Sequence, residues 1–178
     1  METLTEALTP QTRALSPAAA KLQSRVNHPL LFAGWSLMKL PSALFTGVRL
    51  ERLEPGRCVT SVPYGWRSQN PFRSTYFAAQ AMAAELSTGA LGMLAVEDAG
   101  VPMSLLIVGL TGTFEKKAVA KSTFVCEQGA SVFAAVAAAK ASGQSQTFVL
   151  DTVGTMADGQ VVSRFSFTWS VKAKRRRD

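Results

Sequence analysis

The sequence predicts an α+β fold in which one antiparallel sheet wraps around a single long, apolar helix. Three observations predict it. The stretch 74–100 contains no Lys or Arg, is rich in Ala, Met and Leu, and carries apolar residues around a whole helical circumference. Residues 161–172 alternate apolar and polar side chains, as a half-buried antiparallel strand does. Segments with the pattern of paired strands also precede and follow the apolar stretch in the sequence.

Two helices are expected before the first strand, over residues 17–27 and 29–40, and the second is opened by a proline and ends near Pro41. Residues 47–53 alternate apolar and charged side chains, which indicates a strand. A turn containing Pro-Gly then returns the chain into a partner strand over 58–64.

The long helix follows a loop at 69–72, with Ser74 or Thr75 as its expected N-cap, and should end near Val96. The short connection at 114–117 predicts a hairpin between the two strands that follow the helix. The open edges of such a sheet favour a dimer. The later elements are expected in the order strand, strand, short helix, strand, strand, over 103–113, 118–127, 129–141, 147–155 and 161–172.

The composition is that of a globular domain. The chain has 178 residues, of which 47% are hydrophobic and 17% charged, so one domain with a substantial core is expected. No uninterrupted apolar stretch is long enough to span a membrane. The acidic first residues do not form a secretory signal, and the cytoplasm is the expected compartment. Cys58 and Cys126 are too few for a disulfide framework or a metal site.

The basic character is concentrated at the C-terminus. The net charge is +7, and without the five cations between Lys172 and Arg177 and the final Asp178 the rest of the chain carries +3. The predicted organisation is an N-terminal extension over 1–28, one domain over 29–173 and a basic tail over 174–178. A solvated tail is the favoured interpretation and no nucleic acid is expected as a partner, because no aromatic residues interleave with the cations.

Glu85 stands inside the apolar helix without a cation in the same segment. Burial without a partner raises the pKa of a carboxyl group, and such groups concentrate at functional sites. Two interpretations are open from the helix alone. Glu85 is a functional acid, or it is a structural carboxylate at a subunit interface or paired with a distant Arg.

Several motifs resemble the hotdog fold, in which a curved antiparallel sheet wraps a central helix, and within it the DUF4442 branch of thioesterase-like proteins. They are the turn Leu53-Glu54-Pro55-Gly56, the loop Asn70-Pro71-Phe72 and the helical segment Ala83-Ala84-Glu85-Leu86. The extra helix over 129–141 is similar to that branch as well. The resemblance covers residues 29–173.

The resemblance implies an acyl-CoA thioesterase-like hydrolase. In many hotdog thioesterases an Asn or Gln in the loop before the helix is followed fifteen residues later by an acid, and Asn70 and Glu85 match this spacing. Glu85 is then expected to activate water or attack the thioester at a dimer-interface site. Asn70 would orient the water or the carbonyl, or else only stabilise its loop as an Asx turn.

A backbone amide near Tyr76 or Phe77 is expected to polarise the thioester carbonyl. Many relatives have His-Gly-Gly where this chain has Tyr76-Phe77-Ala78. Each further substrate contact also has a structural interpretation, which is core packing, a satisfied buried amide or a solvated surface. Tyr76, Phe77 and Met82 would line an acyl channel, and Arg67 and Arg73 would contact the phosphates of coenzyme A. Gln80 would hydrogen-bond across a dimer, and Thr88 lies one residue before the position, one turn past the acid, where many hotdog thioesterases have a Ser or Thr.

The resemblance also implies partners. The substrate would be an acyl-CoA or another acyl thioester, coenzyme A would enter only as part of it, and the protein would be a homodimer or a dimer of dimers. No other cofactor and no metal are expected, and a Ser-His-Asp set is implausible because His28 is the only histidine. One alternative is a non-catalytic acyl-CoA or fatty-acyl binding hotdog protein. Another is an adaptor that uses the basic tail.

Overall fold

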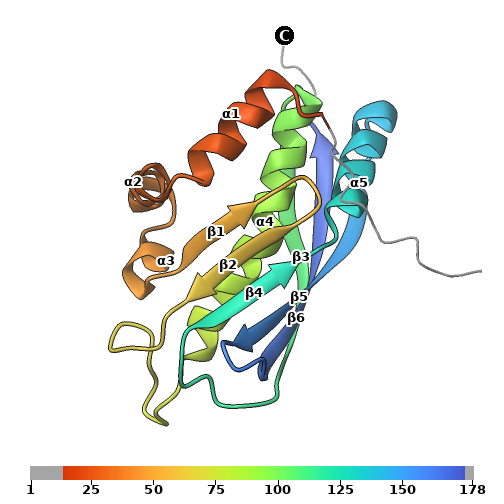
Figure 1. Ribbon diagram of the computed structural model, residues 1–178. Helices are drawn as coiled ribbons and strands as arrows, with labels where there is room; N and C mark the ends of the chain where they lie inside the picture. Colours follow the sequence, from red (N-terminus) through yellow and green to blue (C-terminus); the bar gives the residue numbers. More distant parts are fainter. Residues whose placement is uncertain (1–13, 175–178) are drawn as a thin grey trace, which may run out of the picture.

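A computed structural model describes residues 14–174 (Figure 1). Within this range the chain forms one six-stranded antiparallel sheet and five helices. The elements follow in the order α1 (Pro17–Val26), α2 (Pro29–Lys39), α3 (Pro41–Thr46), β1 (Arg49–Leu53), β2 (Cys58–Val62), α4 (Phe77–Ala99), β3 (Met103–Phe114), β4 (Ser122–Cys126), α5 (Gly129–Ser142), β5 (Gln146–Met156) and β6 (Val161–Ala173).

The sheet has the strand order β1-β2-β4-β5-β6-β3 and packs against α4. Figure 1 shows α4 running along the sheet, with α1, α2 and α3 on one side of it and α5 on the other. The apolar face of β6 is buried, including Phe165, Phe167 and Trp169. The expected antiparallel sheet around one long apolar helix is therefore confirmed.

The long helix α4 is buried along most of its length, and its small residues allow close packing. Ala79, Ala83 and Leu91 are at most 1% exposed, and Gly100 ends the helix in the left-handed conformation with φ 66°. The expected N-cap was wrong. Tyr76 holds that position without a side-chain hydrogen bond, because Thr75 Oγ1 instead donates to the carbonyl oxygen of Ala118 at 3.1 Å.

The predicted hairpin between β3 and β4 was wrong as well. β3 pairs with β6, whereas β4 lies between β2 and β5. The reason is strand length. A strand of 12 residues needs a long partner for its backbone hydrogen bonds, and β6 has 13 residues whereas β4 has 5. The segment 114–121 therefore carries the chain from one edge of the sheet into its middle.

The N-terminal layer contains one helix more than predicted. Pro41 does not end the helical region but opens α3 at its first position, which suits a residue without an N–H group. The β1–β2 pair and the extra helix α5 are confirmed. Over residues 14–174, no helix is both long enough and apolar enough to cross a membrane.

Candidate functional site

Glu85 lies on α4, and the absence of a side chain at Gly89, beside the ring of Trp169, leaves room for its carboxylate. A Cβ atom at Gly89, one turn later, would lie 2.9 Å from Glu85 Oε1 and 3.3 Å from the Trp169 ring. The bare backbone at Gly89 thus leaves space for the carboxylate to lie back along the helix near the indole of Trp169. Because a larger residue would compete for this space, the position of the carboxylate depends on Gly89.

The Glu85 carboxylate has no hydrogen bond and no ion pair among the described residues, so no distant Arg of residues 14–174 pairs with it. Burial raises its pKa above the ordinary value of 4.5, because removal from water disfavours the charged form. A carboxyl group with a raised pKa and unused oxygens is suited to accept a proton from water.

A recess of about 200 Å³ opens beside Glu85. It brings Glu85 together with Met82, which the sequence had also assigned to the site. Its other wall is the junction of α2 and α3, which sequence reasoning did not assign to the site. The sequence feature that could have indicated this wall is Pro41, which marks a bend in the chain. The lining residues are Lys39, Leu40, Pro41, Ser42, Ala43, Met82, Glu85 and Leu86.

The beginning of α4 offers two unpaired backbone amides. The Tyr76 N–H donates to the carbonyl oxygen of Ser68 at 2.7 Å, so it is already used. No side chain caps the helix, and the N–H groups of Phe77 and Ala78 have no acceptor among residues 14–174. Glu85 lies eight residues beyond Phe77, which places it about 12 Å further along the helix axis.

Asn70 is engaged within its own loop. Its Oδ1 accepts hydrogen bonds from the Phe72 N–H at 2.9 Å and the Ser74 N–H at 3.2 Å, which is an Asx-type arrangement. Its Nδ2 donates to Ser74 Oγ at 3.1 Å and retains a second hydrogen. Asn70 therefore stabilises its own loop, as the Asx-turn interpretation predicts, and one N–H of its side-chain amide is left for a ligand.

Gln80 and Thr88 are buried and hydrogen-bonded inside the chain. Gln80 Nε2 donates to the carbonyl oxygen of Thr75 at 3.1 Å, and its Oε1 accepts from Ser163 Oγ at 2.8 Å. Thr88 Oγ1 accepts from Trp169 Nε1 at 3.1 Å and donates to the Glu85 carbonyl oxygen at 2.9 Å. These bonds hold α4 against β6, and through Trp169 they shape the surroundings of Glu85.

The remaining predicted substrate contacts lie outside the recess. Tyr76 and Phe77 are 46% and 55% exposed, and their ring centroids are 4.8 Å apart at the beginning of α4. Phe77 also contacts Phe114 of β3, with 6.4 Å between ring centroids. Arg67 and Arg73 are exposed, and neither lines the recess.

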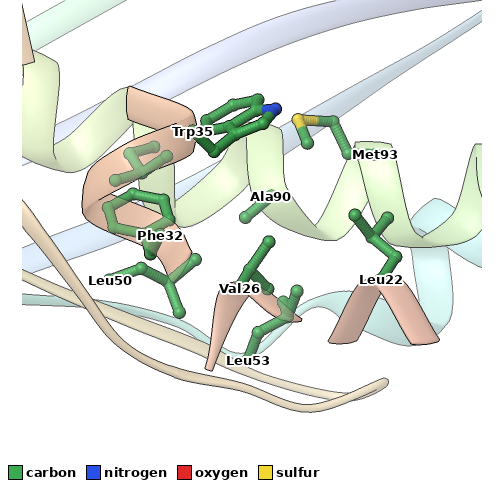
Figure 2. A pocket seen from close by; sticks show the side chains of 9 residues that line it. Leu22, Val26, Phe32, Trp35, Leu50, Leu53, Ala90 and Met93 are labelled. Atoms are coloured by element: carbon green, nitrogen blue, oxygen red, sulfur yellow. The ribbon is translucent and has the colours of Figure 1, made fainter. Parts of the chain in front are cut away.

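A second hollow lies behind Leu86 and is lined by apolar side chains only. Figure 2 shows side chains of α1, α2, β1 and α4, among them Val26, Phe32 and Ala90, pointing toward one another around it. Its volume of about 10 Å³ is barely enough to admit one water molecule, and its lining offers it no polar contact. It is a packing gap and not a ligand site.

Comparison with known proteins connects this geometry to a family. The model of the family described as "Domain of unknown function (DUF4442)" matches residues 31–171. The chain has no match among curated proteins.

Solved structures share the fold. A protein of unknown function from Pseudomonas aeruginosa, called a probable thioesterase, is 20% identical with a TM-score of 0.69, covering 82% of this chain and 97% of that one. A thioesterase variant from the same organism is 18% identical with a TM-score of 0.59, covering 80% and 93%. A thioesterase from Haemophilus influenzae is 10% identical with a TM-score of 0.59, covering 91% and 94%. The chain therefore has the hotdog fold.

Proposed function

The chain belongs to the DUF4442 family, and from this premise we propose that it hydrolyses acyl thioesters, with acyl-CoA as the substrate class and Glu85 as the base. One observation carries the proposal. The carboxylate of Glu85 is unpaired among the described residues, has a raised pKa and lines a recess beside the central helix. The similar solved structures that are called thioesterases support it.

The reaction needs few groups. Glu85 takes a proton from water, the water oxygen bonds to the thioester carbon, and the carbon–sulfur bond breaks. The proton passes to the departing thiolate, so that a carboxylic acid and coenzyme A are released. Direct attack by Glu85 through an acyl anhydride is the variant of this mechanism, and water then hydrolyses the anhydride. The apolar wall of Leu40, Met82 and Leu86 would receive the acyl group.

The negative charge that develops on the carbonyl oxygen needs hydrogen-bond donors, and the unpaired amides of Phe77 and Ala78 are suited to this. Within one chain these amides lie about 12 Å along the helix from Glu85, too far to contact the same thioester. We infer a homodimer, or a dimer of dimers, in which the helix start and Asn70 of one chain face Glu85 of the other. The exposed edge strand β3, with Leu106 and Leu110 both more than half exposed, is a surface that a second copy could cover.

A second candidate is acyl-CoA or fatty-acyl binding without hydrolysis. The observation in its favour is the packing of Tyr76 against Phe77 at the beginning of α4, where the usual turn of hotdog thioesterases has glycines. These rings would hinder the approach of a thioester to the backbone amides. Tyr76→Gly would then raise turnover, whereas a fall in turnover would assign Tyr76 to the site.

The test is the release of free coenzyme A from short, aromatic and long acyl-CoAs, with Glu85→Gln beside the wild type. We expect turnover on part of the panel and its loss in the variant, with the far-ultraviolet spectrum unchanged. Glu97→Gln is the matched control, because Glu97 is an exposed carboxylate on the same helix. Turnover that survives Glu85→Gln would remove Glu85 from the mechanism. No turnover from folded protein, with retained binding of acyl-CoA, would favour the second candidate.

A further inference from the structure

The solvent side of α2 is apolar. Leu30, Leu31, Leu37 and Met38 are 77%, 53%, 65% and 80% exposed, and they define what we name the outer face of α2. At helical spacing they share one side, opposite the buried Phe32. Water normally meets charged or polar residues on such a side, and the outer face has none. A contiguous apolar surface of this kind indicates a binding partner.

The segment of chain that forms the outer face carries charge of one sign. From residue 7 to residue 50 the sequence contains no Asp or Glu. In the same stretch Lys21, Arg25, Lys39 and Arg49 are exposed, and Lys39 ends α2 itself. None of these four cations forms an ion pair within residues 14–174. The segment that carries the outer face therefore contributes cations and no carboxylate, and the acids beside these cations come from other segments, Glu51 near Arg49 and Glu85 in the recess with Lys39.

Two exposed aromatic residues lie on α3, which packs against α2, and on the loop after β2. Phe45 of α3 and Trp66 of the loop after β2 are 57% and 78% exposed, and their ring centroids lie 6.3 Å apart in an edge-to-face contact. Arg67 follows directly and is exposed. Figure 1 shows α2, α3 and this loop along the same side of the molecule.

Leu, Met, Phe and Trp side chains beside Lys and Arg are the combination with which helices lie in the headgroup region of a membrane. A symmetric contact with a second copy fits less well, because the cations of one outer face would meet the same cations of the other, and α2 itself carries no carboxylate to pair them. With 11 residues, α2 is about 16 Å long, so it would lie on the membrane surface and not cross it.

We propose that the outer face of α2, together with Phe45 and Trp66, docks this protein on an anionic lipid surface. The recess beside Glu85 begins at Lys39, at the end of the same helix, so docking would place its opening next to the lipid headgroups. The docking does not depend on thioester hydrolysis, since it uses no residue of the recess except the charge of Lys39.

The experiment is flotation of the full chain with vesicles. Wild-type protein should float with vesicles of phosphatidylcholine and phosphatidylglycerol, and much less with phosphatidylcholine alone or at high salt. The double variant Leu37→Gln, Met38→Gln should lower the partition coefficient roughly tenfold, because apolar contact area is lost. The control is Val119→Gln, Val149→Gln, which changes two exposed apolar residues outside this surface and should bind as the wild type does. Circular dichroism would establish that all variants are folded.

The basic tail is the competing source of lipid binding, so Arg175, Arg176 and Arg177 are replaced by Gln in a further variant. Binding that disappears in this variant and is unchanged by the Leu37, Met38 pair would overturn the proposal. Light scattering then tests whether a second copy of the chain covers the outer face. If the Leu37, Met38 pair converts a dimer into a monomer and wild-type protein does not float with anionic vesicles, the outer face is covered by a second copy and the proposal is wrong.

Discussion

Glu85 differs from an ordinary surface carboxylate because it is largely buried and no described cation pairs with it. Its raised pKa has one cause, burial, since no described residue donates to it. Its position has a separate cause, the missing side chain at Gly89. These two causes can be tested independently.

Gly89→Ala tests the position. The added Cβ would compete with Glu85 Oε1, so the carboxylate should move and thioester turnover should fall. Stability should change little, because the preference of a helix for Ala over Gly, about 1 kcal/mol, is opposed by the approach of the new Cβ to the Trp169 ring at 3.3 Å. Gly34→Ala on α2 is the control, since nothing lies within 4 Å of its added Cβ and only the gain in stability is expected. Unchanged turnover in Gly89→Ala would contradict the assigned role of this space.

Glu85→Gln tests the pKa. The folded state holds the proton of Glu85 more tightly than the unfolded chain does, so Glu85 contributes stability below its ordinary pKa and loses it as pH rises through the folded pKa. The variant should therefore be more stable than the wild type at neutral pH and about equal at acidic pH. Urea unfolding at a series of pH values measures this difference. A difference that does not change with pH would show that the carboxyl is not perturbed.

At the scale of the elements, α2 and α4 carry two buried serines with opposite environments. Ser36 Oγ on α2 has no hydrogen-bond partner among the described residues, although Ser36 is 1% exposed. Ser87 Oγ on α4 lies 2.6 Å from the Ala84 carbonyl oxygen and 2.9 Å from Thr152 Oγ1 of β5. One hydroxyl is buried without compensation, and the other connects the central helix to the sheet.

This contrast predicts opposite signs for one substitution. Ser36→Ala should raise the free energy of unfolding by about 1 kcal/mol, because it removes an unsatisfied buried hydroxyl. Ser87→Ala should lower it by about 1–2 kcal/mol, because Thr152 loses its partner. Chemical denaturation of both variants decides the matter, and equal effects would mean that Ser36 finds a partner in solution.

Local patterns predicted the elements better than their pairing. The alternation in β6 and the apolar composition of α4 are properties of single segments, and both elements form as predicted. The hairpin at β3 depended on a short connection, which a longer and better-matched partner strand outweighs. Likewise, Pro41 predicts the end of a helix, but a proline that opens a new helix at its first position gives the same local pattern.

At the scale of the whole molecule, the central question is whether one chain contains a complete site. The unpaired helix-start amides and Glu85 are separated by about 12 Å along α4, and no bend in the chain brings them together. A site composed of two chains follows from the proposed mechanism, and it makes a prediction that a monomer could not satisfy.

That prediction is complementation. Glu85→Gln and Asn70→Ala should each abolish turnover alone, and mixtures that are unfolded and refolded together should recover part of it, because one of the two sites in a mixed dimer is intact. Light scattering of the wild type should give twice the chain mass of 19.0 kDa, or four times it. A monomer, or mixtures without activity, would contradict the composite site.

The sequence by itself determined the class of fold and the central helix, because these depend on composition and periodicity within short segments, and it singled out Glu85 as a carboxylate without a cation in its own segment. Only the tertiary structure decided what surrounds the acid. Lys39, Leu40 and Pro41 line its recess from a distant part of the chain, and Gln80 and Thr88 are held by hydrogen bonds to β6 that no local pattern specifies. Contacts between segments far apart in the chain depend on packing, and a linear pattern does not contain that information.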